Sequence, residues 1–147
     1  WSSEWEMFQA GDYGRAATAT AGAEDPEGRF IHSASLYYQW GVKKYRECIE
    51  DLEQAAALQD GPDIKTEADR ILAVIYFELG RYDLSYRHIL SLVNIQPENE
   101  IAETSFYIMV ISSINTGNRD NAKKYLQMMK TYYPGSQYLS EIDMGTD

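Results

Sequence analysis

Residues 69–97 have the sequence DRILAVIYFELGRYDLSYRHILSLVNIQP, which contains the clearest pattern in the chain. Apolar residues recur at helical spacing on both sides of Gly80. Glycine allows the left-handed backbone conformation that ends a helix and reverses the chain direction. Proline cannot continue a helix, so Pro97 marks the end of the second apolar run. These residues therefore predict a helix, a short turn and a second helix.

The same landmarks recur along the whole chain at a nearly fixed interval. The only prolines are 36, 35 and 37 residues apart: Pro26, Pro62, Pro97 and Pro134. A glycine stands between two helix-like segments at four places: Gly11, Gly41, Gly80 and Gly117. A period in the thirties indicates an array of helical repeats. Such units stack into binding surfaces and seldom contain catalytic groups.

A small residue follows each of these turns. Three turns also contain a tyrosine that can pack between the two helices, whereas Arg119 takes this place in the last unit. The small residues come three positions after the tyrosine or, in the last unit, after the arginine: Ala16, Cys48, Ser85 and Ala122. Because small side chains allow two helices to approach closely, we expect these four residues in helix–helix contacts. Cys48 is then a buried structural thiol, since a reactive one needs exposure and a positive field.

The pattern in 69–97 resembles the tetratricopeptide repeat. The matching positions are, in order, Leu72, Ala73, Tyr76, Gly80, Tyr82, Ser85, Ile89, Leu92 and Pro97. Parts of the motif recur earlier, at Ala34, Tyr37 and Gly41 and at Gly11, Tyr13 and Ala16. The resemblance implies an all-α fold, a right-handed superhelical solenoid of antiparallel helix pairs.

The chain also departs from this motif. Asp69 stands where the family often has tryptophan, Val110 and Ser113 replace alanine and tyrosine in the last unit, and the turn that starts at Gly41 has two extra residues. We expect one array of about four units over residues 1–147, with a short capping helix near 136–143 that Ser136 caps. Only ten residues precede Gly11. We therefore expect the first unit to be truncated, with Trp1 inside its first helix and earlier residues removed.

Composition argues against several classes of function. The net charge is −10, and no segment is basic enough to neutralise a phosphate backbone, so we expect no nucleic-acid partner. No apolar run is long enough for a transmembrane segment. A single cysteine excludes an internal disulfide and a cysteine-built zinc site. The histidines, His32 and His88, lack ligands at metal-binding spacing, and we expect His88 to face solvent. We therefore predict no metal, no cofactor, no catalytic residue and no enzymatic activity.

In the tetratricopeptide family, ligands commonly lie against the first helices of successive units. By position, the resemblance places eight principal candidates on this concave face: Trp5, Phe8, Tyr38, Arg70, Val74, Phe77, Tyr107 and Ile111. Aromatic residues and arginine often anchor interfaces, and Arg70 could bind a carboxylate. For each residue, packing between helices is the alternative. We expect a scaffold that binds a protein or peptide segment in this groove.

Three other interpretations remain open. The array could self-associate as a homo-oligomer, or its groove could hold a small molecule in an accessory subunit. The acidic run Glu47, Glu50, Asp51 and Glu53 is either a solvated helix face or a docking patch for a basic partner. Residues 124–138 are similar to repeats of bacterial cell-envelope proteins, including outer-membrane assembly lipoproteins and a coiled-coil cell-division partner protein. This similarity favours the periplasm or cell envelope over the cytoplasm.

Overall fold

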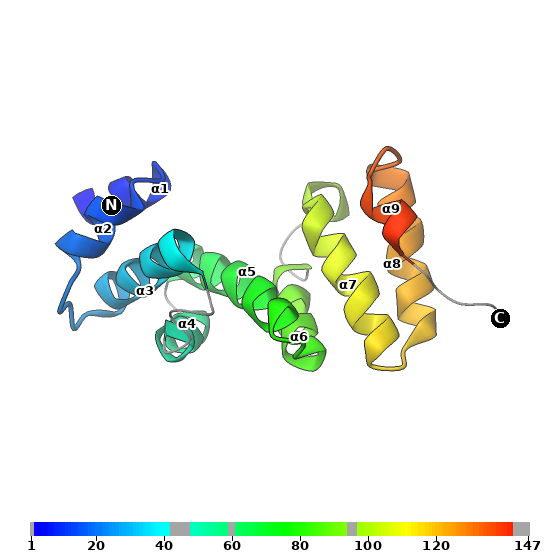
Figure 1. Cartoon of the computed structure of the whole chain (residues 1–147), viewed down its shortest axis with the longest axis horizontal. Coiled ribbons are helices and arrows are strands. Elements are labelled where there is room, and N and C mark those ends of the chain that lie inside the picture. Colours follow the sequence, from blue (N-terminus) through cyan, green and yellow to red (C-terminus); the bar gives the residue numbers. More distant parts are fainter. Residues whose placement is uncertain (1, 42–47, 59–60, 94–96, 143–147) are drawn as a thin grey trace. The chain divides into compact units, whose positions relative to one another are not determined.

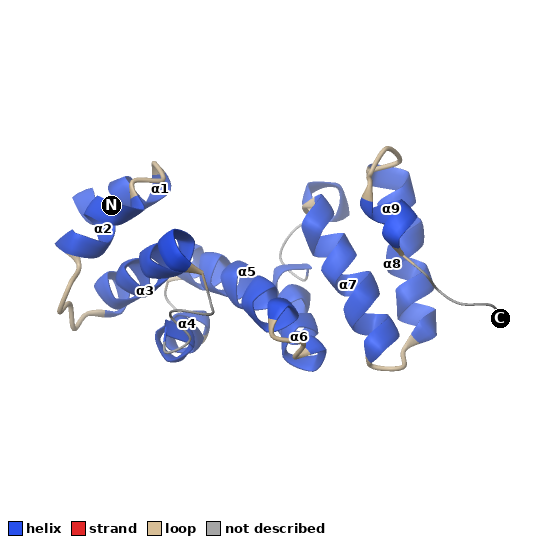
Figure 2. Cartoon of the chain, viewed as in Figure 1, coloured by secondary structure: helices blue, strands red, loops and turns tan. Residues whose placement is uncertain are grey.

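The computed structural model describes residues 2–41, 48–58, 61–93 and 97–142. Of these residues, 78% are helical and none lies in a strand (Figure 2). The predicted all-α fold is confirmed. Tyr45 and Glu47, the long turn after Gly41, and Trp1 lie outside the described residues.

The chain divides into two compact units, residues 1–72 and residues 73–147. Four helices lie wholly in the first unit (Figure 1): α1 (Ser3–Gln9), α2 (Tyr13–Ala19), α3 (Pro26–Trp40) and α4 (Cys48–Ala56). Helix α5 (Pro62–Glu78) contributes residues to both units. The second unit also contains α6 (Tyr82–Val93), the short 3-10 helix η1 (Glu98–Glu100), α7 (Glu103–Asn115), α8 (Arg119–Tyr132) and α9 (Tyr138–Glu141).

Aromatic rings form much of the core of the first unit. Helix α1 packs against α2 and α3, and α3 packs against both α2 and α4. The ring of Phe8 lies 5.5 Å from that of Phe30 and 5.8 Å from that of Trp5. All three side chains are buried. Aromatic rings bury a large apolar area each, which lets the seven-residue α1 contribute to a core.

The core of the second unit is built mainly from aliphatic side chains and methionine. Helix α7 lies between α6 and α8, and α9 packs against α8. The largest fully buried residues include Ile89, Phe106, Met109 and Met129. The small residues are buried as predicted, and the Ser85 hydroxyl donates a 2.6 Å hydrogen bond to the Ala73 carbonyl. This bond requires close approach of α5 and α6 within the unit.

Two turns of the second unit close in the same way. Gly80 and Gly117 have φ angles of +75° and +81°, in the left-handed region that glycine adopts at low cost. The amide after each glycine bonds to a carbonyl five residues earlier, Arg81 N to Tyr76 O and Asn118 N to Ser113 O, both at 2.8 Å. Such bonds satisfy the last carbonyls of the first helix. The repeated glycines therefore produce the predicted helix–turn–helix pairs.

The expectation that His88 faces solvent is wrong. Its side chain is buried, and its ring stacks on that of Tyr76 with centroids 5.8 Å apart. His88 follows Ser85 by three positions and precedes Leu92 by four, so it belongs to the inward face of α6. Its place in the helical period, rather than its polarity, determines its burial.

A serine hydroxyl accepts a backbone hydrogen bond at the start of the first and of the last described helix. Helix α1 begins at Ser3, and the Ser2 hydroxyl caps it by accepting a 3.1 Å bond from Trp5 N. The prediction that Trp1 lies within this helix falls outside the described residues. At the other end, the Ser136 hydroxyl accepts a 3.2 Å bond from Tyr138 N.

Pro26 begins α3 instead of closely following the helix before it, because proline is compatible with the first helical position.

Candidate functional site

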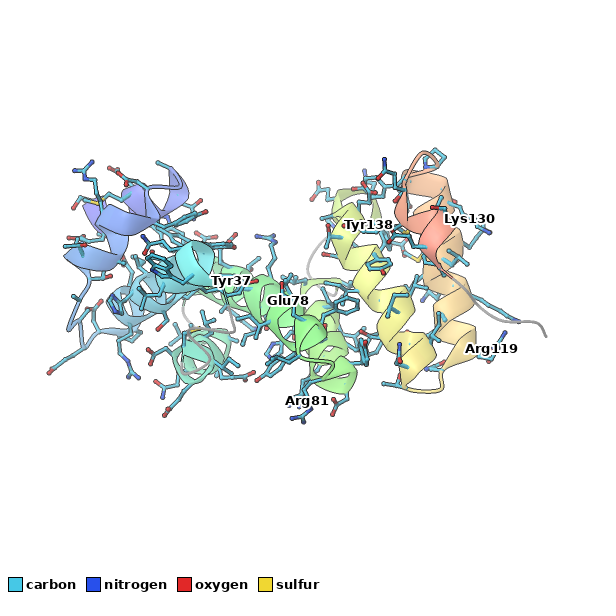
Figure 3. All side chains as sticks on the ribbon, viewed as in Figure 1. Tyr37, Glu78, Arg81, Arg119, Lys130 and Tyr138 are labelled. Carbon is cyan, nitrogen blue, oxygen red and sulfur yellow. The ribbon has the colours of Figure 1, made fainter. Side chains whose placement is uncertain are left out.

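Four rings of the second unit contact one another in a row. Tyr82 lies 5.5 Å from Phe77, Phe77 lies 5.8 Å from Tyr107, and Tyr107 stacks on Tyr138 at 4.3 Å. Figure 3 shows Tyr138 on α9, directed toward α7. All four side chains are half-buried, so part of each ring is accessible. We call these four residues the aromatic row.

The helical period explains how the row forms. On α7, the residues at one face are fully buried, including Phe106, Met109 and Val110. Tyr107 and Ile111 lie beside this face and are half-buried. Phe77 and Tyr82 flank the Gly80 turn, which brings the end of α5 next to the start of α6. The row therefore lies at the border between core and solvent.

A cavity of about 610 Å³ adjoins the end of the row at Tyr138. It is lined by residues of α7, α9 and the segment after α8: Glu103, Thr104, Tyr133, Gly135, Ser136, Gln137, Tyr138 and Glu141. We call it the C-terminal pocket. The Tyr133 hydroxyl donates a 2.7 Å bond to the Ile101 carbonyl, and the Ser136 hydroxyl donates to the Glu103 carboxylate. These bonds fix the segment that forms one wall of the pocket.

The electrostatics of this region are acidic. Burial raises the pKa of the Tyr107 hydroxyl above its usual value, and the nearby Glu141 carboxylate raises it further. A negative charge opposes the formation of a tyrosinate, so Tyr107 stays neutral. Two carboxylates line the pocket, those of Glu103 and Glu141, and no described residue of the lining is basic.

Among the predicted site residues of the first unit, Trp5 and Phe8 lie in the core, as the packing alternative required. Tyr38 is 41% exposed and stacks on Tyr13 with centroids 4.7 Å apart. Its ring also lies 6.0 Å from that of Phe8. Partial burial is the main cause that raises the pKa of the Tyr38 hydroxyl above its usual value. The Glu67 carboxylate raises this pKa further. Tyr38 is therefore the accessible edge of a mostly buried cluster.

The other predicted residues have varied surroundings. Arg70 is bound to Glu67 on its own helix, so its guanidinium already has a carboxylate partner. Val74 packs with Phe77 and Tyr107 against the core of the second unit. Of the predicted set, the structure therefore brings together Val74, Phe77 and Tyr107 in one unit, and Trp5, Phe8 and Tyr38 in the other.

Part of the acidic run has a structural role. The Asp51 carboxylate accepts a 2.5 Å bond from Arg29 and a 2.7 Å bond from Ser33, which tie α4 to α3. Glu50 is exposed. A carboxylate on an outer helix face would be freely solvated. Asp51 is not, because its carboxylate is bound to α3.

Glu103, Tyr138 and Glu141 were not predicted from the sequence as candidate site residues. The sequence predicted a short capping helix near 136–143, capped by Ser136. No spacing pattern indicates that this helix places a tyrosine on the ring of Tyr107. That contact joins residues 31 positions apart and depends on how α9 folds back.

The structure gives no indication of a metal centre or a membrane span in the part it describes. No group of three or more histidine, cysteine, aspartate or glutamate side chains among residues 2–41, 48–58, 61–93 and 97–142 could hold a metal ion. Within the same ranges, no helix combines the length and apolar character needed to cross a bilayer.

Solved structures with the same fold exist. The structure titled MamA MSR-1 matches with a TM-score of 0.69 and 18% identity, over 94% of this chain and 79% of that chain. MamA AMB-1 matches with a TM-score of 0.66 and 18% identity, over 89% of this chain and 75% of that chain. No protein-family model matches the chain, and no curated protein matches it. MamA contains tetratricopeptide repeats, so the likeness confirms a fold of that type.

Proposed function

We propose that this protein is a non-enzymatic interaction scaffold that binds a segment of a partner protein along the aromatic row. The observation behind the proposal is the chain of ring contacts from Tyr82 through Phe77 and Tyr107 to Tyr138. Tyrosine and other aromatic residues often dominate binding energy, because each offers a large rigid surface and, in tyrosine, a polar tip.

The surroundings of the row also favour binding over catalysis. The tyrosine hydroxyl of Tyr107 is held neutral, and no described nucleophile is paired with a general base along the row. A row of half-buried rings instead provides a preformed apolar surface whose residues lose little freedom when a partner binds. The fold shared with the MamA structures is consistent with a scaffold.

The test compares two tyrosines of the same unit. Tyr107→Ala removes the centre of the row, whereas Tyr132→Ala removes an exposed tyrosine on α8 that stacks on Phe106 outside the row. Partners are captured from a lysate with the wild-type chain and identified, and their affinities are then measured by calorimetry. We expect Tyr107→Ala to weaken binding by about 1 kcal/mol or more and Tyr132→Ala to leave it nearly unchanged. Equal effects of the two variants would place the binding surface elsewhere.

Self-association is the competing interpretation, and the same variants separate it from the scaffold. A scaffold stays monomeric in light scattering over a range of concentrations until its partner is added. If the wild-type chain forms oligomers that Tyr107→Ala dissociates, the row is an interface between copies of this chain.

A further inference from the structure

We propose that the C-terminal pocket binds a lysine or arginine side chain of the partner segment. This inference rests on the proposed function and specifies the partner that the aromatic row would take. Tyr138 connects the two features, because it stacks on Tyr107 in the row and also lines the pocket. A segment lying along the row would therefore reach the pocket with one of its side chains.

The charge of the pocket lining, which holds two carboxylates and, among its described residues, no basic one, favours a basic ligand at this place. The arginines and lysines of the second unit belong to α6, to α8 or to the turn before α6: Arg81, Arg87, Arg119, Lys123, Lys124 and Lys130. The two carboxylates of the pocket belong instead to α7 and α9. Opposite charges in a binding partner increase the rate of association and determine its orientation.

The shape and chemistry of the lining fit the same ligand. A basic side chain consists of an apolar stem and a charged head, and the pocket offers both kinds of surface. The Tyr138 ring can contact the stem or attract the cation through its face. The carboxylates of Glu103 and Glu141 and the hydroxyls of Thr104 and Tyr133 offer acceptors to the head.

The pocket is also preorganised on one side. The Glu103 carboxylate accepts a hydrogen bond from Ser136, and the Ser136 hydroxyl in turn accepts one from Tyr138 N. This hydrogen-bond chain holds one carboxylate in place, while a second oxygen of Glu103 can still accept a bond. The Glu141 side chain lies on an exposed turn of α9 and supplies the second negative charge.

The inference can be tested with two small probes that differ in charge but hardly in shape. N-acetyl-arginine amide is titrated into the ¹⁵N-labelled chain, and backbone amide shifts are recorded. N-acetyl-citrulline amide, the neutral isostere, serves as the control probe. We expect saturating shifts at Thr104, Gln137 and Glu141 with the arginine probe, and at least about fivefold weaker binding of the citrulline probe, as for loss of one partly exposed ion pair.

Two matched variants test the carboxylate. Glu141→Gln should weaken binding of the arginine probe about fivefold. Glu98→Gln should leave this binding unchanged, because Glu98 is an exposed glutamate of η1 outside the pocket lining. Equal binding of both probes, equal effects of both variants, or no saturating shift below about 50 mM would overturn the inference. Circular dichroism of both variants checks that helix content is unchanged.

The same variants show whether the inference or the proposed function fails. If Tyr107→Ala abolishes partner binding and Glu141→Gln does not change it, the scaffold function stands and the basic-residue pocket is wrong. If neither variant changes partner binding, both proposals are wrong.

Discussion

The two units place their aromatic side chains differently. In the first unit, Trp5, Phe8 and Phe30 are buried and form the core between α1, α2 and α3. In the second unit, the row that contains Phe77 and Tyr107 lies at the border of a core made mainly of aliphatic residues and methionine. An aromatic residue on the first helix of a repeat therefore does not by its position alone belong to a binding surface.

Helix length gives a physical reason for the buried rings of α1, Trp5 and Phe8. Helix α1 has seven residues, whereas α7 has 13. A helix of two turns has few inward positions, so large rings must fill the space that a longer helix fills with several aliphatic side chains. Of the two aromatic residues on the longer α7, Phe106 is fully buried, whereas Tyr107 is half-buried and remains available to a ligand.

The most direct way to break this comparison is to truncate one ring in each unit. Phe30→Ala should cost about 3–5 kcal/mol in the free energy of unfolding, because the ring is fully buried against Trp5 and Phe8. Tyr107→Ala should cost clearly less, since its ring is half-buried. Denaturant titration measures both values. Equal losses would show that the row is as much a part of the core as Phe30.

A second test uses the inward face of α6. Ile89→Ala should cost about 2–5 kcal/mol, as truncation of a buried aliphatic residue usually does. His88→Ala should cost about 1–3 kcal/mol, because it removes a buried ring that stacks on Tyr76. Chemical denaturation of both variants gives the comparison. A loss for His88→Ala below about 0.5 kcal/mol, the usual range of surface changes, would contradict its burial.

A buried charge distinguishes the two units at equivalent repeat positions. Phe106 is fully buried in the last repeat, whereas the preceding repeat has Asp69, whose carboxylate binds Lys65 at 2.7 Å. Lys65→Met keeps the apolar stem but removes the charge that faces Asp69. We expect a loss of about 1–2 kcal/mol, limited because the Lys65 side chain is 38% exposed. Thermal unfolding measures it, and Lys124→Met on the exposed face of α8 should change the melting temperature little.

The smallest effect on stability is expected for a buried hydroxyl that makes no hydrogen bond to a described residue. The Ser112 hydroxyl is fully buried and has no hydrogen-bond partner among the described residues. Ser112→Ala removes this polar group with little change in volume, so stability should stay within about 0.5 kcal/mol or increase. Ser85→Ala is the matched contrast, because it deletes the bond to the Ala73 carbonyl and should cost about 1 kcal/mol. Destabilisation of Ser112→Ala comparable to that of Ser85→Ala would imply a partner for its hydroxyl.

The local rules of the fold could be predicted from sequence, because they depend on few residues. Gly80 and Gly117 determine the turns, and Ala122 and Ser85 mark the helix contacts. The direction in which a helix residue points was predicted less well. Polarity suggested that His88 is exposed, whereas the period of α6 places it in the core. The candidate site depends on longer-range contacts. Phe77 and Tyr107 could be selected by repeat position, but Tyr138 and Glu141 reach the candidate site through a segment whose direction no local pattern determines.

The brevity of α9 has a consequence for kinetics. A helix of four residues is one turn, far below the length of about 12–15 residues at which isolated helices become stable in water. Its order therefore depends on contacts such as the stacking of Tyr138 on Tyr107, and it should open locally more readily than the rest of the unit. Each opening removes Tyr138 and Glu141 from the pocket. The residence time of a bound partner would then follow the opening rate of this single turn, and occupancy would be visible as slower hydrogen exchange at its amides.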